Sequence, residues 1–205
     1  MSKINPNPAV ATKPVRVFTT RTLVFCALLA ALQVVLARLM VPMPAADTRF
    51  SIEAIPVVLA GLLFGPLPGA LVGFSADLVG CLFSGFGYNP IFALPPILYG
   101  LCGGLFQGYV SRKPSILRIL MMYLPAVILG SILYQSFALT YVYSKDGAFW
   151  VALWTRLGAR SVQFAVTMAV EVVITNLLIK SRIFHRAGLF PPASRKKQDA
   201  DTYQA

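Results

Sequence analysis

The sequence predicts an all-α integral membrane protein with six transmembrane helices and both termini in the cytoplasm. Of its 205 residues, 57% are hydrophobic and 12% are charged, and the mean hydropathy is +0.72. The apolar residues gather into stretches close to the ~20 residues that a helix needs to cross the hydrocarbon core. Lysine and arginine cluster instead in the segments that flank these stretches. Together these features exclude an ordinary soluble domain.

Each of six apolar stretches is expected to form one span of a single polytopic domain. They cover residues 22–41, 52–64, 67–83, 91–110, 116–141 and 150–179. The run Gly-Pro-Leu-Pro-Gly at 65–69 combines strong helix breakers, so the second and third helices should form a close hairpin. Pro95, Pro96 and Pro125 fall inside later spans and are expected to kink them, as membrane helices tolerate where neighbours satisfy the freed backbone groups.

The distribution of cations predicts the orientation of the chain. Thirteen of the 18 lysines and arginines precede the first span, separate the fourth from the fifth, or follow the sixth. The positive-inside rule makes that side cytoplasmic, so the segments around Asp47, Tyr88 and Asp146 face outward. The predicted parts are a cytoplasmic segment at 1–21, a transmembrane domain at 22–182, and a basic cytoplasmic tail at 183–205 that we expect to be disordered. A cleaved signal peptide at 21–46 is the alternative, but the apolar run is long and lacks a clear small-residue cleavage pattern.

Four ionisable side chains interrupt the apolar spans: Arg38, Asp77, Arg160 and Glu171. Charge at membrane depth is costly, so such residues usually line a site. At ~1.5 Å per residue, Arg38, Asp77 and Arg160 share an outer layer with Arg156, whereas Glu171 lies deeper. They could instead form structural ion pairs, or snorkel at the membrane surface in the case of Arg38. The excess of arginine over aspartate in the outer layer favours an anionic ligand.

The segments predicted to face outward carry aromatic, amide and charged residues suited to a flat ligand that bears an acid group. Rings stack on aromatic ligands, and amides and carboxylates bind heteroatoms. An aromatic belt at the membrane surface is the alternative explanation for the tryptophans and tyrosines. Asn89, Gly85 and Gly87 do not suit a belt, and a glycine-rich outer loop could act as a lid. The candidate residues are Arg49, Glu53, Phe86, Tyr88, Asn89, Phe92, Trp150 and Trp154.

Other functional classes find little support in the sequence. The single histidine, His185, lies in the tail, and no serine has an adjacent base, so no catalytic triad is available and we expect no enzyme. The three cysteines lack metal-ligand spacing, and no metal or cofactor is predicted. The cations flank apolar runs and form no basic face, which argues against nucleic-acid binding. The chain has no Gly-x-x-x-x-Gly-Lys-Ser/Thr loop, so it should not couple ATP itself.

Residues 49–80 contain three runs that support a family resemblance. These are Arg-Phe-Ser-Ile-Glu-Ala-Ile-Pro at 49–56, Ala-Gly-Leu-Leu-Phe-Gly-Pro at 60–66, and Gly-Phe-Ser-Ala-Asp-Leu-Val-Gly at 73–80. With Arg38, the loop at 88–92, Tyr99-Gly100, and Arg160 followed by Gln163, they resemble the S-component of an energy-coupling factor (ECF) vitamin transporter, most of all the folate-specific type. The similarity covers roughly residues 22–180. One departure is Ile91, where the folate pattern usually has glycine between the loop proline and phenylalanine.

The resemblance implies a function in the bacterial cytoplasmic membrane. Such proteins bind a vitamin from outside, dock onto a membrane coupling (T) subunit driven by two ATPases, and reorient to release the vitamin inward. Docking would use the family's small-residue face on the first helix, represented here by Ala27 and Ala31, which are one turn apart. Close packing inside the six-helix bundle is an equal alternative for these alanines.

Roles for the site residues follow from the same resemblance. Arg38 and Arg49 would contact ligand carboxylates or other oxygen atoms, and Asp77 or Glu53 would pair with the amino and ring N–H groups of a pterin. The aromatic residues Tyr88, Phe92, Trp150 and Trp154 would close over the ring near Asn89, and Arg160 with Gln163 would line the floor. Pantothenate or a queuosine precursor is the alternative ligand. A secondary carrier that uses Asp77 or Glu171 as a relay, and a membrane scaffold without a ligand, also remain open.

Overall fold

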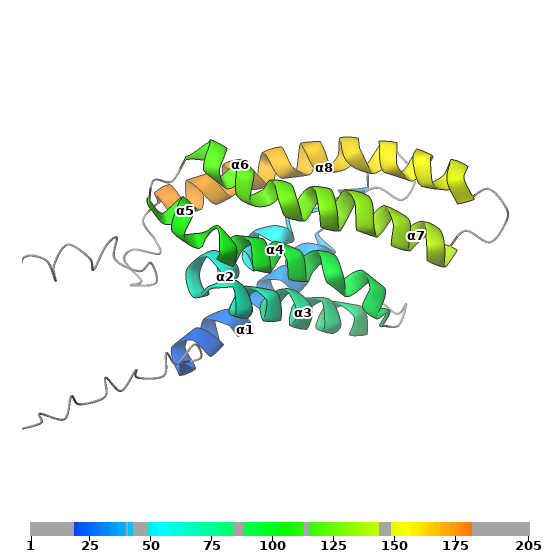
Figure 1. The fold of residues 1–205 in the computed structure, drawn as a ribbon. Coiled ribbons are helices and arrows are strands. Elements are labelled where there is room, and N and C mark those ends of the chain that lie inside the picture. The colour runs from blue at the N-terminus through cyan, green and yellow to red at the C-terminus, as the bar shows by residue number, and fades with distance from the viewer. Residues whose placement is uncertain are drawn as a thin grey trace, which may run out of the picture.

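The computed structural model describes residues 19–39, 41–42, 49–83, 88–112, 115–143 and 149–181, and these are almost entirely helical (Figure 1). The predicted tail at 183–205, the N-terminal segment before residue 19, Phe86 and the loop glycines lie outside the described residues. The helices are α1 (Thr20–Arg38), α2 (Ala54–Phe64), α3 (Pro66–Leu82), the 3-10 helix η1 (Pro90–Ala93), α4 (Leu94–Leu105), α5 (Gln107–Arg112), α6 (Ile116–Pro125), the π-helix η2 (Ala126–Tyr134), α7 (Gln135–Tyr143) and α8 (Phe149–Lys180).

Three helical segments are long and apolar enough to cross a membrane. They are Thr20–Arg38, Ile116–Tyr143 and Phe149–Lys180. Three shorter apolar helical segments, Ala54–Phe64, Pro66–Leu82 and Pro90–Leu105, coincide with the other expected stretches. The fold is therefore that of a helical membrane protein, while six complete spans and cytoplasmic termini stay predictions.

A short β-ladder is the one departure from the predicted all-α class within the described residues. Strands β1 (Val41–Pro42) and β2 (Arg49–Phe50) pair antiparallel, with Val41 opposite Phe50 and Pro42 opposite Arg49. Strands of two residues have no periodic signal in the sequence. The ladder joins the chain just after α1 to the segment that leads into α2.

The prolines act partly as expected. Gly65 separates α2 from α3 with a φ of 104°, a left-handed value that favours glycine, so the predicted hairpin is confirmed. Pro125 ends α6, and the helix continues as the π-helix η2. The expected kink at Pro95 and Pro96 is wrong, because both residues lie in the first turn of α4. A helix needs no backbone N–H donor there.

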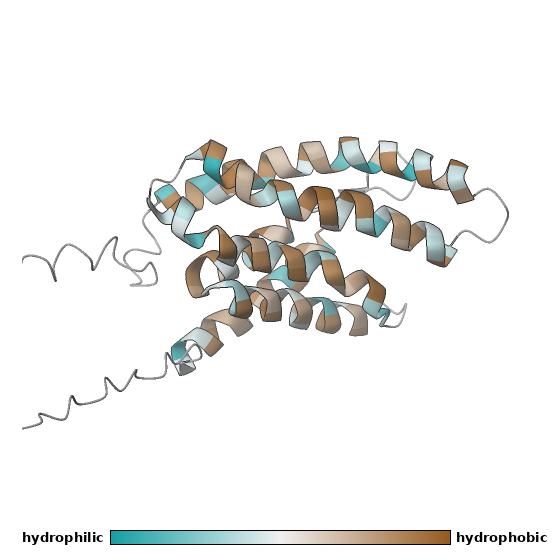
Figure 2. Ribbon diagram, viewed as in Figure 1, coloured by the Kyte–Doolittle hydropathy of each residue, from teal (hydrophilic) through white to brown (hydrophobic). Residues whose placement is uncertain are grey.

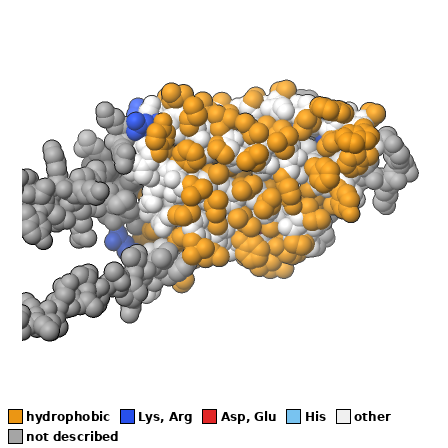
Figure 3. Space-filling model, viewed as in Figure 1, with side chains coloured by type: hydrophobic (Ala, Val, Ile, Leu, Met, Phe, Trp, Pro, Cys, Tyr) orange, Lys and Arg blue, Asp and Glu red, His pale blue; other side chains and the backbone are white. Residues whose placement is uncertain are grey.

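The molecule has an apolar exterior, and polar residues are buried among the apolar residues of its interior. Exposed leucines and valines cover α1, and hydrophobic side chains spread over most of the face in Figure 3. Figure 2 shows hydrophobic residues on every long helix, interrupted by polar positions along α8. Four of those positions, Arg160, Gln163, Thr167 and Glu171, are buried. Apolar residues outside and polar residues inside are what a bilayer requires of an embedded protein.

Helix α2 is the centre of the packing. All its residues but the last are buried, and it contacts α1, α3, α4 and α8. The α2, α3 and α4 backbones approach closely at glycines. A Cβ added to Gly100 of α4 would overlap the backbone of Gly69 of α3, and one added to Gly61 of α2 would overlap the backbone at Gly100. Only glycine permits this separation, and the three helices form the rigid part of the molecule.

We expect Gly100→Ala to destabilise the protein by about 1–3 kcal/mol, because the new methyl group would force α3 and α4 apart. Gly158→Ala is the matched control, since a Cβ at this helical position of α8 meets open space. It should leave stability unchanged or raise it by up to about 1 kcal/mol. Thermal unfolding of both variants in detergent tests the packing, and equal melting temperatures would contradict it.

Candidate functional site

A cavity of about 980 Å³ lies between the helices and is lined from α1, α2, α3, α4, η1, η2, α7 and α8. Its volume lies in the range of sites that enclose a small organic ligand. Arginines, carboxylates, amides and hydroxyls form much of its wall. The cavity is therefore the place in the described structure where the buried polar groups meet.

Helix α8 contributes a row of polar side chains along the length of the cavity. Arg156, Arg160, Gln163, Thr167 and Glu171 all line it. Their spacings of four, three, four and four residues place them on one helix face. The row spans about 22 Å at 1.5 Å per residue. It has cations at the end nearer Phe149 and a carboxylate at the other.

Glu171 lies where α8 meets the start of α2. It is 2% exposed and accepts a hydrogen bond from the backbone N–H of Ala54, the first residue of α2. The first N–H groups of a helix have no partner within the helix, and its N-terminus favours negative charge. Glu53 directly precedes α2, and its charge acts on Glu171. Two carboxylates thus meet at this end of the cavity.

Hydroxyl groups complete the wall near these carboxylates. Tyr99 of α4 and Ser131 of η2 are joined by a hydrogen bond of 3.0 Å between their hydroxyl oxygens. Both residues are buried and both line the cavity. The charges of Glu171, Glu53 and Arg160 all act on Tyr99. The π-helix after Pro125 is the element that brings Ser131 to this position.

Arg38 lines the cavity from α1 and is exposed. Its Nη2 donates a hydrogen bond of 2.7 Å to the carbonyl oxygen of Gly80, which ties the end of α1 to α3. Asp77 and Cys81 line the cavity from α3 beside it, and the charges of Asp77 and Arg38 both act on Cys81. The Arg160 guanidinium lies 5.3 Å from the centre of the Phe164 ring, within cation–π range.

Three buried polar atoms on the cavity wall lack a hydrogen-bond partner within the described part of the chain. They are Gln33 Oε1, Asp77 Oδ2 and Thr167 Oγ1. Buried polar groups in native proteins are almost always paired, and an unpaired one carries a free-energy cost. All three residues line the cavity, from α1, α3 and α8, which fits a polar ligand or water there.

The structure brings seven of the eleven predicted site residues to the cavity and leaves three of the other described residues elsewhere. Trp150 and Trp154 are 68% and 67% exposed and do not line it, and neither does Tyr88. Trp150 packs edge-on against Phe149, with ring centres 5.7 Å apart, so these rings follow the alternative of a surface belt. Arg49 belongs to β2, and its side chain is outside the described residues. The seven are Arg38, Glu53, Asp77, Asn89, Phe92, Arg160 and Gln163.

Several cavity residues were missed in the sequence, and Glu171 was predicted to lie at membrane depth but was given no ligand-binding role. Thr167 and Glu171 continue the helical spacing of Arg160 and Gln163, so the periodicity of α8 could have linked them. Tyr99 was noted only as part of the resemblance. Gln33 and Ser131 are single polar residues inside apolar runs, and nothing in their spacing points to a site.

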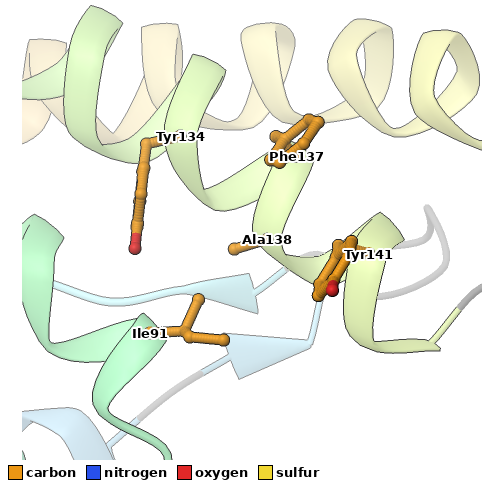
Figure 4. A pocket seen from close by; sticks show the side chains of 5 residues that line it. All are labelled: Ile91, Tyr134, Phe137, Ala138 and Tyr141. Atoms are coloured by element: carbon orange, nitrogen blue, oxygen red, sulfur yellow. The ribbon is translucent and has the colours of Figure 1, made fainter.

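A second, apolar pocket of about 240 Å³ lies between η1 and the segment from η2 to α7. Tyr134, Phe137, Ala138 and Tyr141 line it opposite Ile91 (Figure 4). Ile91 is the residue that departs from the folate pattern. It lines this small pocket and not the larger cavity, whereas its neighbours Asn89 and Phe92 line the larger one.

Comparisons with known proteins found a matching family model and curated relatives. The family model described as "ECF-type riboflavin transporter, S component" matches residues 17–180. A UPF0397 protein of Streptococcus pneumoniae strain CGSP14, and its counterpart from strain ATCC 700669, are each 31% identical to the chain over 93 residues. That match covers 45% of the chain and 51% of each relative, so the chain spans about half the length of these curated relatives.

Two solved structures share the fold. The crystal structure of FolT bound with folic acid aligns with a TM-score of 0.64 and 26% identity, over 78% of this chain and 93% of that chain. The S-component for biotin from an ECF-type ABC transporter aligns with a TM-score of 0.53 and 16% identity, over 78% of this chain and 92% of that chain. The second likeness concerns the fold alone.

We expect Cys81 to react with a small, negatively charged methanethiosulfonate about tenfold faster than the other cysteines, because partly exposed thiols react while buried ones are inert. Cys81 lines the polar cavity, Cys102 is buried, and Cys26 is half-buried and packs against the hydrophobic core. Intact mass after timed labelling of three single-cysteine variants in detergent measures the rates. Faster labelling of Cys26 or Cys102 would contradict the described access to the cavity.

Proposed function

The chain belongs to the ECF-type riboflavin transporter S-component family, and on this basis we propose that it is the vitamin-binding subunit of an ECF importer that takes up folate or reduced folates. The family consists of transport subunits and not of enzymes. The protein would bind its vitamin from outside the bacterial cytoplasmic membrane, with both termini in the cytoplasm. A T subunit and two ATPases would then drive its release inward.

The observation that carries the choice of vitamin is the charged lining of the large cavity. Arg38, Arg156 and Arg160 all line it, and a guanidinium forms bidentate hydrogen bonds with a carboxylate. Folate has carboxylates at one end and a flat, donor-rich heterocycle at the other. The likeness to FolT bound with folic acid supports the same choice. Riboflavin is the second candidate, because the matching family is described by that vitamin, but it has no anionic group for the arginines.

The exposed face of α1 supports docking onto a T subunit. Within the described residues Gln33 is the only fully buried residue of this helix, and Ala27 and Ala31 are exposed. Their exposure supports docking over the alternative that these alanines pack inside the bundle. A row of small residues on an exposed membrane helix allows another helix to approach closely.

We expect the purified protein to bind folate with saturation in detergent, and Arg38→Ala to weaken that binding at least about tenfold. A lost charge-assisted hydrogen bond costs about 1.5–3 kcal/mol. Isothermal titration calorimetry with folate, 5-formyltetrahydrofolate, riboflavin and pantothenate measures the affinities. The exposed positions of Trp150 and Trp154 make tryptophan fluorescence a poor reporter.

The matched control for this prediction is Arg118→Ala. Arg118 also donates to a backbone carbonyl, that of Tyr109 at 3.1 Å, but it does not line the cavity. Its loss should leave folate affinity unchanged. Saturable binding of riboflavin or pantothenate without folate would keep the transport class and overturn the proposed vitamin. Unchanged affinity in a folded Arg38→Ala protein would remove Arg38 from the site.

A second prediction concerns docking. Ala27→Leu combined with Ala31→Leu should abolish co-purification with the T subunit and its ATPases, because larger side chains prevent close helix contact. Vitamin binding by the isolated variant should persist, since neither alanine lines the cavity. Ala165→Leu with Ala169→Leu is the control, as these are exposed alanines one turn apart on α8. Loss of the complex in the control alone would place the docking surface on α8.

A further inference from the structure

The large cavity has opposite charges at its two ends along α8. Arg160 and Glu171 are eleven residues apart, close to three turns, so they share one helix face about 16 Å apart. Arg156 lies one turn further from Glu171, and Glu53 acts electrostatically on Glu171 from the start of α2. Along α8 a ligand that fills the cavity therefore meets guanidinium groups at one end of the row and the Glu171 carboxyl group at the other, while the carboxyl group of Asp77 lies on α3.

The carboxylate end is built to accept hydrogen bonds. Glu171 is 2% exposed, lines the cavity, and already accepts the N–H of Ala54. One turn along α8, Thr167 is 5% exposed, and its Oγ1 has no partner among the described residues. The carboxyl groups of Glu171 and Glu53 both line the cavity, and their oxygens can accept hydrogen bonds from a ligand that brings N–H donors to this place. This end suits an amino group beside a ring N–H, the edge that a 2-amino-4-oxo heterocycle presents.

The opposite end is suited to an anion. The buried Arg160 guanidinium is held over the Phe164 ring, and both residues line the cavity. Arg156 lines the same wall from the next turn of α8. Arginine binds carboxylates through paired N–H groups, and packing on a ring restricts the positions that it takes. Gln163 lies between Arg160 and Thr167 and completes the row with a neutral group.

We propose that the cavity binds folate in one orientation, with the pterin edge at Glu171 and Glu53 and the glutamate tail at Arg160 and Arg156. In this arrangement Glu171 is the residue that selects a donor-rich heterocycle. The proposal rests on the proposed function and deepens it, since it assigns a ligand-binding role to a residue to which the family resemblance gave none. Of the two carboxylates expected to pair with the ring, Asp77 and Glu53, it keeps Glu53 and adds Glu171 of α8.

The test titrates wild type, Glu171→Gln and Arg160→Gln with folate and with its two halves, 6-hydroxymethylpterin and p-aminobenzoylglutamate. Glu171→Gln should weaken folate and the pterin half by about tenfold to a hundredfold and leave the tail half unchanged. Arg160→Gln should weaken folate and the tail half and spare the pterin. Ser161→Ala is the control on α8, because Ser161 bonds the Leu157 carbonyl of its own helix and does not line the cavity. It should change none of the three affinities.

A general structural role for Glu171 would lower the affinities for both halves equally. Comparing the two affinities therefore separates recognition of the pterin from such a role. If Glu171→Gln fails to fold, Thr167→Val removes one hydroxyl at similar volume and should selectively weaken the pterin half. If Glu171→Gln loses affinity equally for both halves, or for the tail half alone, the proposed orientation is overturned. Folate remains the proposed vitamin in either case. Failure of the wild type to bind folate overturns the proposed vitamin and the orientation together.

Discussion

The hydrogen bond from the Ala54 N–H to the Glu171 carboxylate is the interaction on which the interior of this protein depends. Helix α2 has 11 residues, too few to cross a bilayer, and it begins inside the molecule. The N–H groups of its first turn are therefore buried without partners in their own helix. The side chain of Glu171 on α8 meets that need by accepting the N–H of Ala54.

The large cavity lies at the buried start of α2, since Ala54 lines it, and the free N–H groups of that first turn need polar partners. The chain reaches Ala54 through Ser51 and Glu53. Both residues line the large cavity together with residues of α1 and α8, which are far apart in the sequence. The remainder of α2 is held firmly, because α3 and α4 approach it at glycine backbones. The protein thus has a tightly packed region, where the backbones of α2, α3 and α4 touch, and beside it a large cavity lined by polar side chains.

The arrangement of charge links this architecture to ligand binding. Buried carboxylates and arginines within a membrane domain are expensive, and separating them along one helix leaves each group able to interact with a different part of a ligand. The polar row on α8 separates its ionisable groups in this way, with Arg156 and Arg160 at one end and Glu171 at the other. The π-helix after Pro125 adds Ser131 and its bond to Tyr99, a local irregularity of the kind often found at functional sites. Helices therefore contribute most of the described residues that line the cavity.

The sequence by itself determined which segments are helical and apolar, the hairpin turn at Gly65, the burial of Arg160 and Glu171, and the family. Composition, helix breakers and the cost of charge in lipid act locally, so they can be read from the order of residues. Only the tertiary structure decided that Trp150 and Trp154 lie outside the cavity, that Ile91 lines the small pocket, that Pro95 begins a helix, and that Glu171 meets α2. Each of these depends on which helix faces pack together, and that is set by backbone approach between segments far apart in the chain.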